Sequence, residues 1–487
     1  MELFHNISQI AVPVILGIYI ISILVVVVYT VLENRNPVKT ISWVLVLILL
    51  PVIGFVFFIF FGQNFRKEKI IARKGLRNHE ALSNLAHEQI HRLSEGENIE
   101  NPRLEVKRSL ITLLLNNSNA LVTIGNNVEV LQNGKATFEA IITALESAIS
   151  FIHLEYYIFA DDQIGGIIKD ILKRKAAEGL EVRLIVDDVG SWELKTPFFK
   201  EMWNAGIQAY SFLQVRFPNL TSKVNYRNHR KIIVIDGHVG FLGGINIADR
   251  YMSGSAEYGI WRDTHLKIEG DAVNTLQTVF LTDWFFVSQI EIHDRRYFPV
   301  KRPVGHKMAQ IVASGPDSDW PAIMMGIFQA VASATSYVYI ATPYFMPSES
   351  VLLALKTAAL GGVDVRIIIP EKSDAFVTLL SSRSFIREML EADIRFYFYQ
   401  KGFLHSKVMI VDDVISVVGS ANMDFRSFEQ NFEVAAFIFD EATAYSLKRS
   451  FLEDLLHSRP VILEEWNKRP IVEKAKESFA RLISPLL

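Results

Sequence analysis

The part of the chain after residue 105 repeats one order of strand-like and helix-like segments, and this repeat constrains the fold more than any other feature. Short runs of β-branched and aromatic residues alternate there with segments of helical period, which is typical of layered α/β structure. The predicted strands are 151–158, 182–186 and 230–235 in the first series and 337–341, 365–369 and 406–411 in the second. Helices are predicted at 165–179 and 349–361, in matching positions. We therefore expect an α/β fold with two similar halves related by a pseudo-twofold.

The apolar residues of the chain are concentrated before this repeat. Hydrophobic residues make up 50% of the chain, and the runs 10–31 and 41–61 contain no Asp, Glu, Lys or Arg. Each run, as a helix, is long enough to span a hydrocarbon layer of about 30 Å. A cleaved signal peptide is the alternative for the first run, but no basic segment precedes it and the second run follows after nine residues. An N-terminal transmembrane helical hairpin is therefore expected.

The segment that follows the second run is basic. Between residues 66 and 80 there are six Lys or Arg residues and two Glu residues, whereas the connection between the runs is only mildly basic. Basic segments next to membrane spans tend to stay on the cytoplasmic side. We therefore expect a multi-pass protein of the cell membrane, with both termini and the main body in the cytoplasm. The basic cluster would then lie close to anionic head groups.

Composition also marks domain boundaries. Arg and Pro residues concentrate at 296–308, between the two series of strands. The predicted divisions are a membrane anchor at 1–65, a basic juxtamembrane linker at 66–104, a first half at 105–300 and a second half at 301–487 that ends in a helix. The net charge of −3 argues against a nucleic-acid partner. Because the chain has no cysteine, disulfides, thiol nucleophiles and Cys-bound metals are excluded.

Both halves carry the pattern H-x-K-x4-D at the third predicted strand of each series. In each copy a glycine follows the histidine after 14 residues and an asparagine follows it after 17. The members of the two copies are His229, Lys231, Asp236 and Asn246 in the first half and His405, Lys407, Asp412 and Asn422 in the second. A single copy would more often be structural, whereas a matched pair with equal spacing indicates a functional site.

These residue types suit chemistry at a phosphate. Residues two apart on a strand point to the same face, so each histidine lies beside its lysine. Two such faces around one phosphodiester would let the lysines neutralise its oxygens while one histidine attacks phosphorus and the other protonates the leaving alcohol. Asp236 and Asp412 complete the candidate catalytic set, with the expected role of fixing the strand ends. A metal site is the alternative, but the lysines disfavour a cation, and neither metal nor cofactor is expected.

The chain resembles the phospholipase D superfamily, and within it the bacterial cardiolipin synthases. The resemblance rests on the paired motifs, the segment GSANMDFRS at 419–427, the apolar hairpin with ENRNPVKT at 33–40, and the closing PLL at 485–487. It implies two phospholipase D-like halves and a phosphatidyltransferase that joins two phosphatidylglycerols, through a phosphohistidine and without metal, to give cardiolipin and glycerol. The implied partners are phosphatidylglycerol and anionic membrane lipids, and the oligomeric state stays open.

The same resemblance implies different roles for the two histidines. His229 is expected to be the nucleophile, and His405 to act first as the acid and then as the base. An acidic residue is expected on the other ring nitrogen of each histidine. The candidates are Asp263 and Glu433, which lie 34 and 28 residues after the histidine of the same half. An ordinary surface position is the alternative for both.

Substrate contacts are expected from Asn246, Asn422 and the hydroxyl of Ser420. The halves differ here, because Gly244 occupies the position that corresponds to Ser420. Aromatic residues at strand ends, among them Tyr157, are candidates for the mouth of the site, although such residues more often belong to a core.

The C-terminal segment is expected to form a helix with Ile471, Ala475, Phe479 and Leu482 on one face. Packing of this face against the body is favoured over contact with a membrane interface.

Other functions remain open. A hydrolytic phospholipase D would use the same phosphohistidine and water, and a related transferase would use another alcohol. A phosphodiesterase for nucleic acid shares the motif, but the apolar runs and the near-neutral charge argue against it. An inactive membrane scaffold is disfavoured because His, Lys, Asp and Asn are intact in both halves.

Overall fold

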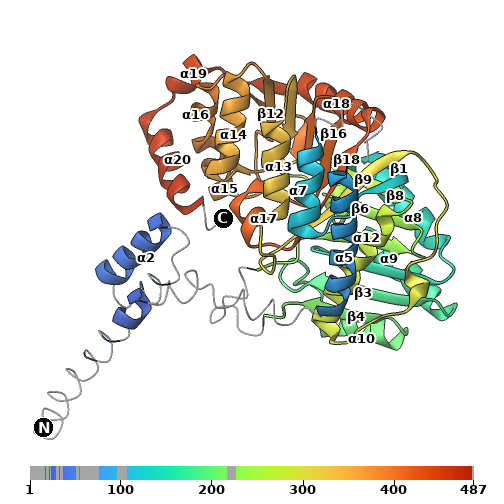
Figure 1. Cartoon of the computed structure of the whole chain (residues 1–487). Helices are drawn as coiled ribbons and strands as arrows, with labels where there is room; N and C mark the ends of the chain where they lie inside the picture. The colour runs from blue at the N-terminus through green and yellow to red at the C-terminus, as the bar shows by residue number, and fades with distance from the viewer. Residues whose placement is uncertain are drawn as a thin grey trace, which may run out of the picture. The chain divides into compact units, whose positions relative to one another are not determined.

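The computed structural model describes residues 107–215 and 226–484, the segment 76–95, and parts of the N-terminal region (17, 21, 23–28, 32, 37–50 and 54). The chain divides into two compact units, one of residues 1–69 with 217–222 and the other of 70–216 with 223–487. The larger unit contains both predicted halves except residues 217–222. Figure 1 shows its helices and strands, coloured by residue number.

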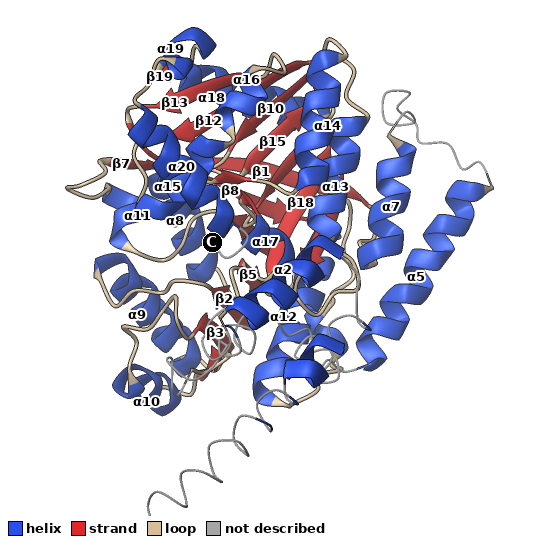
Figure 2. Ribbon diagram, turned by 90° about the vertical axis from the view of Figure 1, so that its left-hand side faces the viewer, coloured by secondary structure: helices blue, strands red, loops and turns tan. Residues whose placement is uncertain are grey.

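One sheet of fifteen strands runs through the described part of the larger unit (Figure 2). Its first-half strands are β1 (Thr123–Gln132), β2 (Phe151–Tyr156), β3 (Glu181–Asp187), β4 (Gln208–Phe212), β5 (Lys231–Ile235), β6 (Val239–Gly243) and β8 (Thr264–Glu269). Its second-half strands are β9 (Lys307–Ser314), β10 (Tyr337–Ala341), β12 (Asp364–Pro370), β13 (Arg395–Tyr399), β15 (Val408–Val411), β16 (Ile415–Gly419), β18 (Glu433–Phe439) and β19 (Ser458–Pro460). Two small sheets pair β7 (Ile260–Arg262) with β14 (Gly402–Leu404) and β11 (Phe345–Met346) with β17 (Met423–Asp424).

The order of the strands repeats outward from the centre of the large sheet. β1 and β9 pair antiparallel in the middle. Outward from them lie β8, β6, β5, β2 and β3 on one side and β18, β16, β15, β10 and β12 on the other. β2 and β3 are parallel, as are β10 and β12, whereas β5 and β15 run antiparallel to β2 and β10. The prediction of an α/β fold with two similar halves is therefore confirmed.

The predicted strands match the observed ones closely. The segment 337–341 coincides with β10, and the other five predictions differ from an observed strand by at most two residues at either end. The two predicted helices correspond to α9 (Gln163–Ala177) and α14 (Glu349–Leu360). The strand predictions succeeded because the strands are buried on both faces and are therefore written as continuous apolar runs in the sequence.

Helices cover both faces of the sheet. On one face, α12 (Ala272–Ser288) and α18 (Glu441–Leu456) share a core with strands of both halves. On the other face, α8 (Asn133–Glu146), α9 and α10 (Thr196–Asn204) cover the first half, and α7 (Arg108–Ser118), α13 (Ala322–Ala332) and α14 cover the second. The remaining helices of this unit are α5 (Leu76–Ser94), α11 (Asp249–Ser253), α15 (Phe376–Ser384), α16 (Ile386–Leu390), α17 (Phe425–Glu429), α19 (Leu463–Asn467), α20 (Ile471–Ile483) and a short 3-10 turn at Arg295–Tyr297. α5 lies inside the predicted linker and packs against α7.

The C-terminal helix α20 corrects one prediction. It packs on α15, but the buried residues of α20 are Glu477 and Ala480, while Phe479 and Leu482 are exposed. The prediction that its apolar face packs against the body is therefore wrong. The physical reason is that charged side chains, rather than apolar ones, attach the helix to its neighbours.

The predicted membrane hairpin lies mostly outside the described residues. α2 (Pro37–Leu49) covers part of the second apolar run. Within the segments that the structure describes, no helix is both long enough and apolar enough to cross a membrane. The basic positions 66–74 and the closing residues 485–487 also lie outside the described residues.

Candidate active site

Backbone hydrogen bonds between the halves bring the two motifs to one place. The amide of His229 donates to the carbonyl of Phe432 at 2.9 Å, and the amide of Phe432 donates to the carbonyl of Arg227 at 2.9 Å. In the corresponding position of the other half, the amide of His405 donates to the carbonyl of Arg262 at 2.8 Å, where β7 pairs with β14. Each histidine therefore enters its strand, β5 or β15, directly from a backbone bridge to the opposite half.

The two predicted carboxylates contact the histidines, and each contacts the histidine of the opposite half. Both carboxylate oxygens of Glu433, at the start of β18, lie 3.0 Å from Nδ1 of His229. Oδ2 of Asp263, between β7 and β8, lies 2.7 Å from Nδ1 of His405. The separations counted within one half therefore do not describe the pairing. Because a carboxylate holds Nδ1 of each ring, Nε2 is the nitrogen that is left for chemistry at phosphorus. Nζ of Lys407 lies near both ring nitrogens of His405, 3.0 Å from Nδ1 and 3.1 Å from Nε2.

Both lysines are buried beside their histidines. Nζ of Lys231 donates to the carbonyl of His229 at 2.7 Å, and Nζ of Lys407 lies 3.1 Å from Nε2 of His405. Burial lowers the pKa of Lys231 to about 7 and that of Lys407 to about 8. The charge of Lys407 lowers the pKa of Lys231 further, while the nearby carboxylates oppose this. A bound anion would relieve this repulsion and raise the pKa of both lysines, so the pair is suited to hold one.

Both imidazoles are held in the neutral form. Burial lowers the pKa of His229 to about 4 and that of His405 well below its ordinary value. The neighbouring lysines lower both pKa values further. A neutral imidazole has the lone pair that attack on phosphorus requires, whereas a proton donor must first be charged. An anion bound between the lysines would raise the pKa of both rings.

The pKa values of the two carboxylates are shifted in opposite directions. Burial raises the pKa of Asp263 to about 6. Burial also acts on Glu433, but the hydrogen bond from His229 and the charge of Lys231 together outweigh this effect. A hydrogen bond from Ser420 adds to the attraction, so the pKa of Glu433 lies below its ordinary value. Glu433 is therefore held ionised more firmly than Asp263.

The position of Ser420 explains part of this difference. Its hydroxyl donates to Oε2 of Glu433 and accepts from the amide of Val434 at 3.0 Å. At the matching position of the first half, a Cβ on Gly244 would lie 2.2 Å from Oδ1 of Asp263. A serine therefore does not fit there without displacing the carboxylate. The Ser420 hydroxyl, which we expected to contact the substrate, instead donates its hydrogen bond to Glu433.

The two predicted asparagines are buried in different surroundings. The amide nitrogen of Asn246 donates to the hydroxyl of Tyr251 at 2.6 Å, and its oxygen accepts from the amide of Ile158 at 3.2 Å. The side-chain oxygen of Asn422 is buried and has no hydrogen-bond partner among the described residues. A buried acceptor of this kind can receive a hydrogen bond from a ligand hydroxyl.

Asp236 and Asp412 lie at the far ends of β5 and β15 from the histidines. Asp236 accepts hydrogen bonds from the amides of residues 149, 150 and 151 at 2.8 to 2.9 Å. Asp412 accepts from the amides of residues 335, 336 and 337 at 2.8 to 3.0 Å and forms an ion pair with Lys107 at 3.1 Å. These contacts hold the start of β2 and β10 next to the motif strands.

Aromatic rings surround the two histidines unequally. The ring of Tyr157 lies 4.8 Å from that of His229. Three rings lie about His405, at centroid distances of 5.4 to 5.8 Å; they belong to Tyr251, Trp261 and Phe403. These three were missed in the sequence, because they lie on different elements whose proximity depends on the packing of the two halves.

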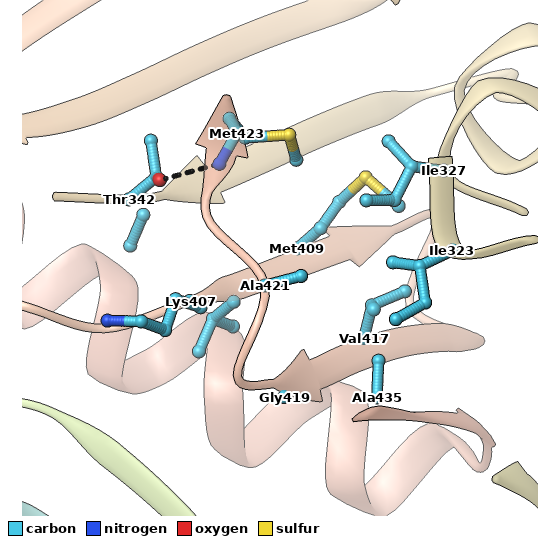
Figure 3. A pocket seen from close by; sticks show the side chains of 12 residues that line it. Ile323, Ile327, Thr342, Lys407, Met409, Val417, Gly419, Ala421, Met423 and Ala435 are labelled. Atoms are coloured by element: carbon cyan, nitrogen blue, oxygen red, sulfur yellow. Dashed lines mark hydrogen bonds between the residues drawn. The ribbon is translucent and has the colours of Figure 1, made fainter. Parts of the chain in front are cut away.

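The residues that pair with Gly243 and Gly419 also differ between the halves. His265 pairs with Gly243 on β6, whereas Ala435 occupies the matching place opposite Gly419 on β16. His265 is fully buried, and both of its ring nitrogens lack a hydrogen-bond partner among the described residues. Beside Ala435 lies a mainly apolar pocket that reaches Lys407 (Figure 3). The smaller side chain thus leaves space in the second half.

Comparisons with known proteins point to one family. The family model described as "Cardiolipin synthase, PLD-like domain" matches residues 141–284 and 327–455, and the model "Phospholipase_D-nuclease N-terminal" matches residues 17–63. The chain is 43% identical over 460 residues to "Cardiolipin synthase 2" of Bacillus anthracis, covering 94% of this chain and 88% of the relative. It is 42% identical over 458 residues to "Cardiolipin synthase" of a Geobacillus species, covering 94% and 90%. The crystal structure of a phosphatidylserine synthase from Haemophilus influenzae has the same fold, with a TM-score of 0.60 at 15% identity over 80% of this chain and 100% of that one.

Proposed function

This chain belongs to the phospholipase D-like cardiolipin synthase family, and we propose that it transfers a phosphatidyl group from one phosphatidylglycerol to another, releasing glycerol. The observation that carries the proposal is the crossed site, in which a carboxylate of each half contacts the histidine of the other half. We infer that a phosphate binds between the two His–Lys pairs, because the charges of the two buried lysines act on each other. The curated relatives, named cardiolipin synthases, cover 94% of the chain and support the choice of reaction.

In the first step, Nε2 of His229 attacks the phosphorus of the donor lipid. A P–N bond forms and the P–O bond to the head-group glycerol breaks. Glu433 accepts the Nδ1–H of His229 and stabilises the positive charge that develops on the ring. His405 delivers its Nε2 proton to the leaving glycerol oxygen, which departs as an alcohol.

In the second step, a hydroxyl of a second phosphatidylglycerol attacks the phosphohistidine. His405, now neutral, takes the proton of that hydroxyl, while the P–N bond breaks and His229 is regenerated. Each turnover therefore consumes two lipids of charge −1 and returns cardiolipin and glycerol, with both histidines restored.

The remaining candidates support these steps. Lys231 and Lys407 would bind the non-bridging oxygens of the phosphate, and the negative charge would raise the pKa of both lysines and of His405. Asn422 would use its buried oxygen to accept a hydrogen bond from a head-group hydroxyl. Asn246, Asp236 and Asp412 would hold the surrounding backbone.

The membrane arrangement forms part of the proposal. We place a two-helix anchor within residues 1–65, followed by a linker to 104 and two catalytic halves that meet near residue 300. The charge-free runs 10–31 and 41–61 and the basic residues after them favour an anchor with the catalytic halves in the cytoplasm. Such an anchor would keep the site close to substrates that stay in the bilayer.

Purified protein incubated with labelled phosphatidylglycerol alone tests the reaction. We expect cardiolipin and glycerol in equal amounts as the main products. Phosphatidic acid as the main product would instead identify a hydrolase that uses the same site. The variants His229→Ala and His405→Ala are controls, because either should remove both products.

A further inference from the structure

The C-terminal helix α20 points its apolar side chains away from the protein. Ile471 is 77% exposed, Phe479 68% and Leu482 76%. With 3.6 residues per turn, these three residues and Val472 lie within an arc of about 100° on the helix surface. A helix on a globular body normally buries such a face, whereas α20 exposes it.

Charged contacts fix this orientation. Arg469, just before the helix, donates to both carboxylate oxygens of the buried Glu477 at 2.6 and 2.9 Å. Arg481 donates to Glu388 at 2.8 Å, and its guanidinium carbon lies 4.2 Å from the ring centroid of Phe385. Turning α20 to bury its apolar face would break these ion pairs. The exposed face is therefore built into the folded body.

The charges around the helix suit an anionic surface. Lys474 and Lys476 lie on the two flanks of the apolar arc, while Glu473 and Glu477 lie on the far side of the helix. Apolar residues between basic flanks are typical of helices that lie in the interface of an anionic membrane. Pairing with a second copy of the chain is less favourable, because two such faces would bring their lysines together.

The apolar surface continues towards the active site. α20 packs on α15 (Figure 2). The first residues of α15, Phe376 and Val377, are also exposed. Asp374, two residues earlier, accepts a hydrogen bond from the hydroxyl of Tyr344 at 2.6 Å. Burial lowers the pKa of Lys407 and of His405, and the charge of Asp374 opposes this effect. The start of α15 therefore lies close to the catalytic groups of the second half.

We propose that α20 and the start of α15 form a docking surface with which the catalytic body lies on a bilayer that contains anionic phospholipid. The surface comprises Ile471, Val472, Phe479 and Leu482 of α20 and Phe376 and Val377 of α15. It orients the site towards the lipid head groups, a task that an anchor connected through a linker does not perform. Docking does not require turnover, so it is tested separately from the reaction.

The absence of cysteine allows a direct test in the full-length protein. Leu482→Cys is labelled with an environment-sensitive fluorophore and reconstituted into vesicles of phosphatidylcholine with phosphatidylglycerol. Leu360→Cys is the matched control, because Leu360 is 72% exposed at the end of α14. It precedes β12, whereas the active site lies at the edge of the sheet where β12 ends. We expect a blue shift and quenching by nitroxide-labelled lipid at position 482 and neither at position 360.

Equal responses at the two positions would overturn the proposal. A response at position 482 that depends on protein concentration and not on lipid quenchers would identify contact between copies, and would also overturn it. A response that persists without phosphatidylglycerol would contradict the claim that Lys474 and Lys476 contribute to docking by binding anionic lipid.

Activity provides a second test. Leu482→Glu should lower turnover on phosphatidylglycerol vesicles at least about tenfold, because one large apolar side chain no longer enters the interface. Its turnover on short-chain phosphatidylglycerol in mixed micelles should equal that of the wild type, and Leu360→Glu should resemble the wild type in both. Loss of activity in micelles as well would contradict a docking role. Wild-type protein that forms no cardiolipin in either system would refute the synthase reaction without bearing on the fluorescence result.

Discussion

The two halves of this protein carry the same motif but surround its histidine differently. His229 lies against Glu433, whose charge is supported by the Ser420 hydroxyl. His405 lies against Asp263, whose pKa burial raises to about 6 and which faces Gly244 at the position that matches Ser420. A nucleophile that becomes positively charged is better stabilised by a firmly ionised carboxylate, whereas an acid must hold and release a proton. The difference favours the proposed assignment, in which His229 is the nucleophile and His405 the acid, although the two motifs are the same.

Removing either histidine should give the largest loss of turnover. His229→Ala and His405→Ala should each lower turnover by a factor of about 10⁴ or more, because the two residues act as a unit. They should differ in the intermediate. With a donor lipid whose leaving group needs no proton, His405→Ala should accumulate a phosphohistidine that maps to the peptide containing His229, and His229→Ala should accumulate none. A phosphorylated peptide containing His405 would reverse the assignment.

Neutralising the carboxylates should give the next largest effect. Glu433→Gln should lower the rate of phosphohistidine formation by about 10³ to 10⁴, since the ring loses the charge that stabilises it. Asp263→Asn should cost less, and its deficit should shrink below pH 6, because Asp263, with a pKa of about 6, is itself protonated there. Single-turnover rates between pH 5 and 8 measure both. Equal deficits at all pH values would remove the distinction between the two sites.

Ser420→Ala should have a smaller effect and a diagnostic pH dependence. The variant removes a hydrogen bond to a charged carboxylate, worth about 1.5 to 3 kcal/mol, so turnover should fall about 10- to 100-fold. Because this hydrogen bond lowers the pKa of Glu433, its loss should raise that pKa and move the acidic limb of the pH–rate profile to higher pH. Ser420→Thr, which keeps the hydroxyl, should restore the wild-type profile. An unchanged limb in Ser420→Ala would limit Ser420 to a packing role.

Local patterns predicted the strands and both motifs because strand period and residue spacing are properties of short segments. The crossed carboxylates were predicted as residues but not as partners, since the pairing of Glu433 with His229 depends on the bridge between the halves. The same limit applies to α20. Its sequence shows that Phe479 and Leu482 share a face, but the direction of that face is decided by Arg469 and Arg481, whose acceptors are seen only in the fold.

The smallest effects are expected at two matching buried positions, His265 in the first half and Ala435 in the second. Ala435 lines the pocket drawn in Figure 3. Ala435→Val adds two methyl groups to an apolar space on a strand, so the free energy of unfolding should rise by about 0.5 to 1 kcal/mol. His265→Ala empties the corresponding space beneath Lys231 and should lower the free energy of unfolding by about 2 to 4 kcal/mol, less whatever is recovered from removing its two unpaired nitrogens. Denaturant titration of both variants measures the pair. A higher free energy of unfolding in His265→Ala would mean that the buried, unpaired imidazole destabilises the fold. The two positions would then differ in the polarity of their side chains rather than in their volume.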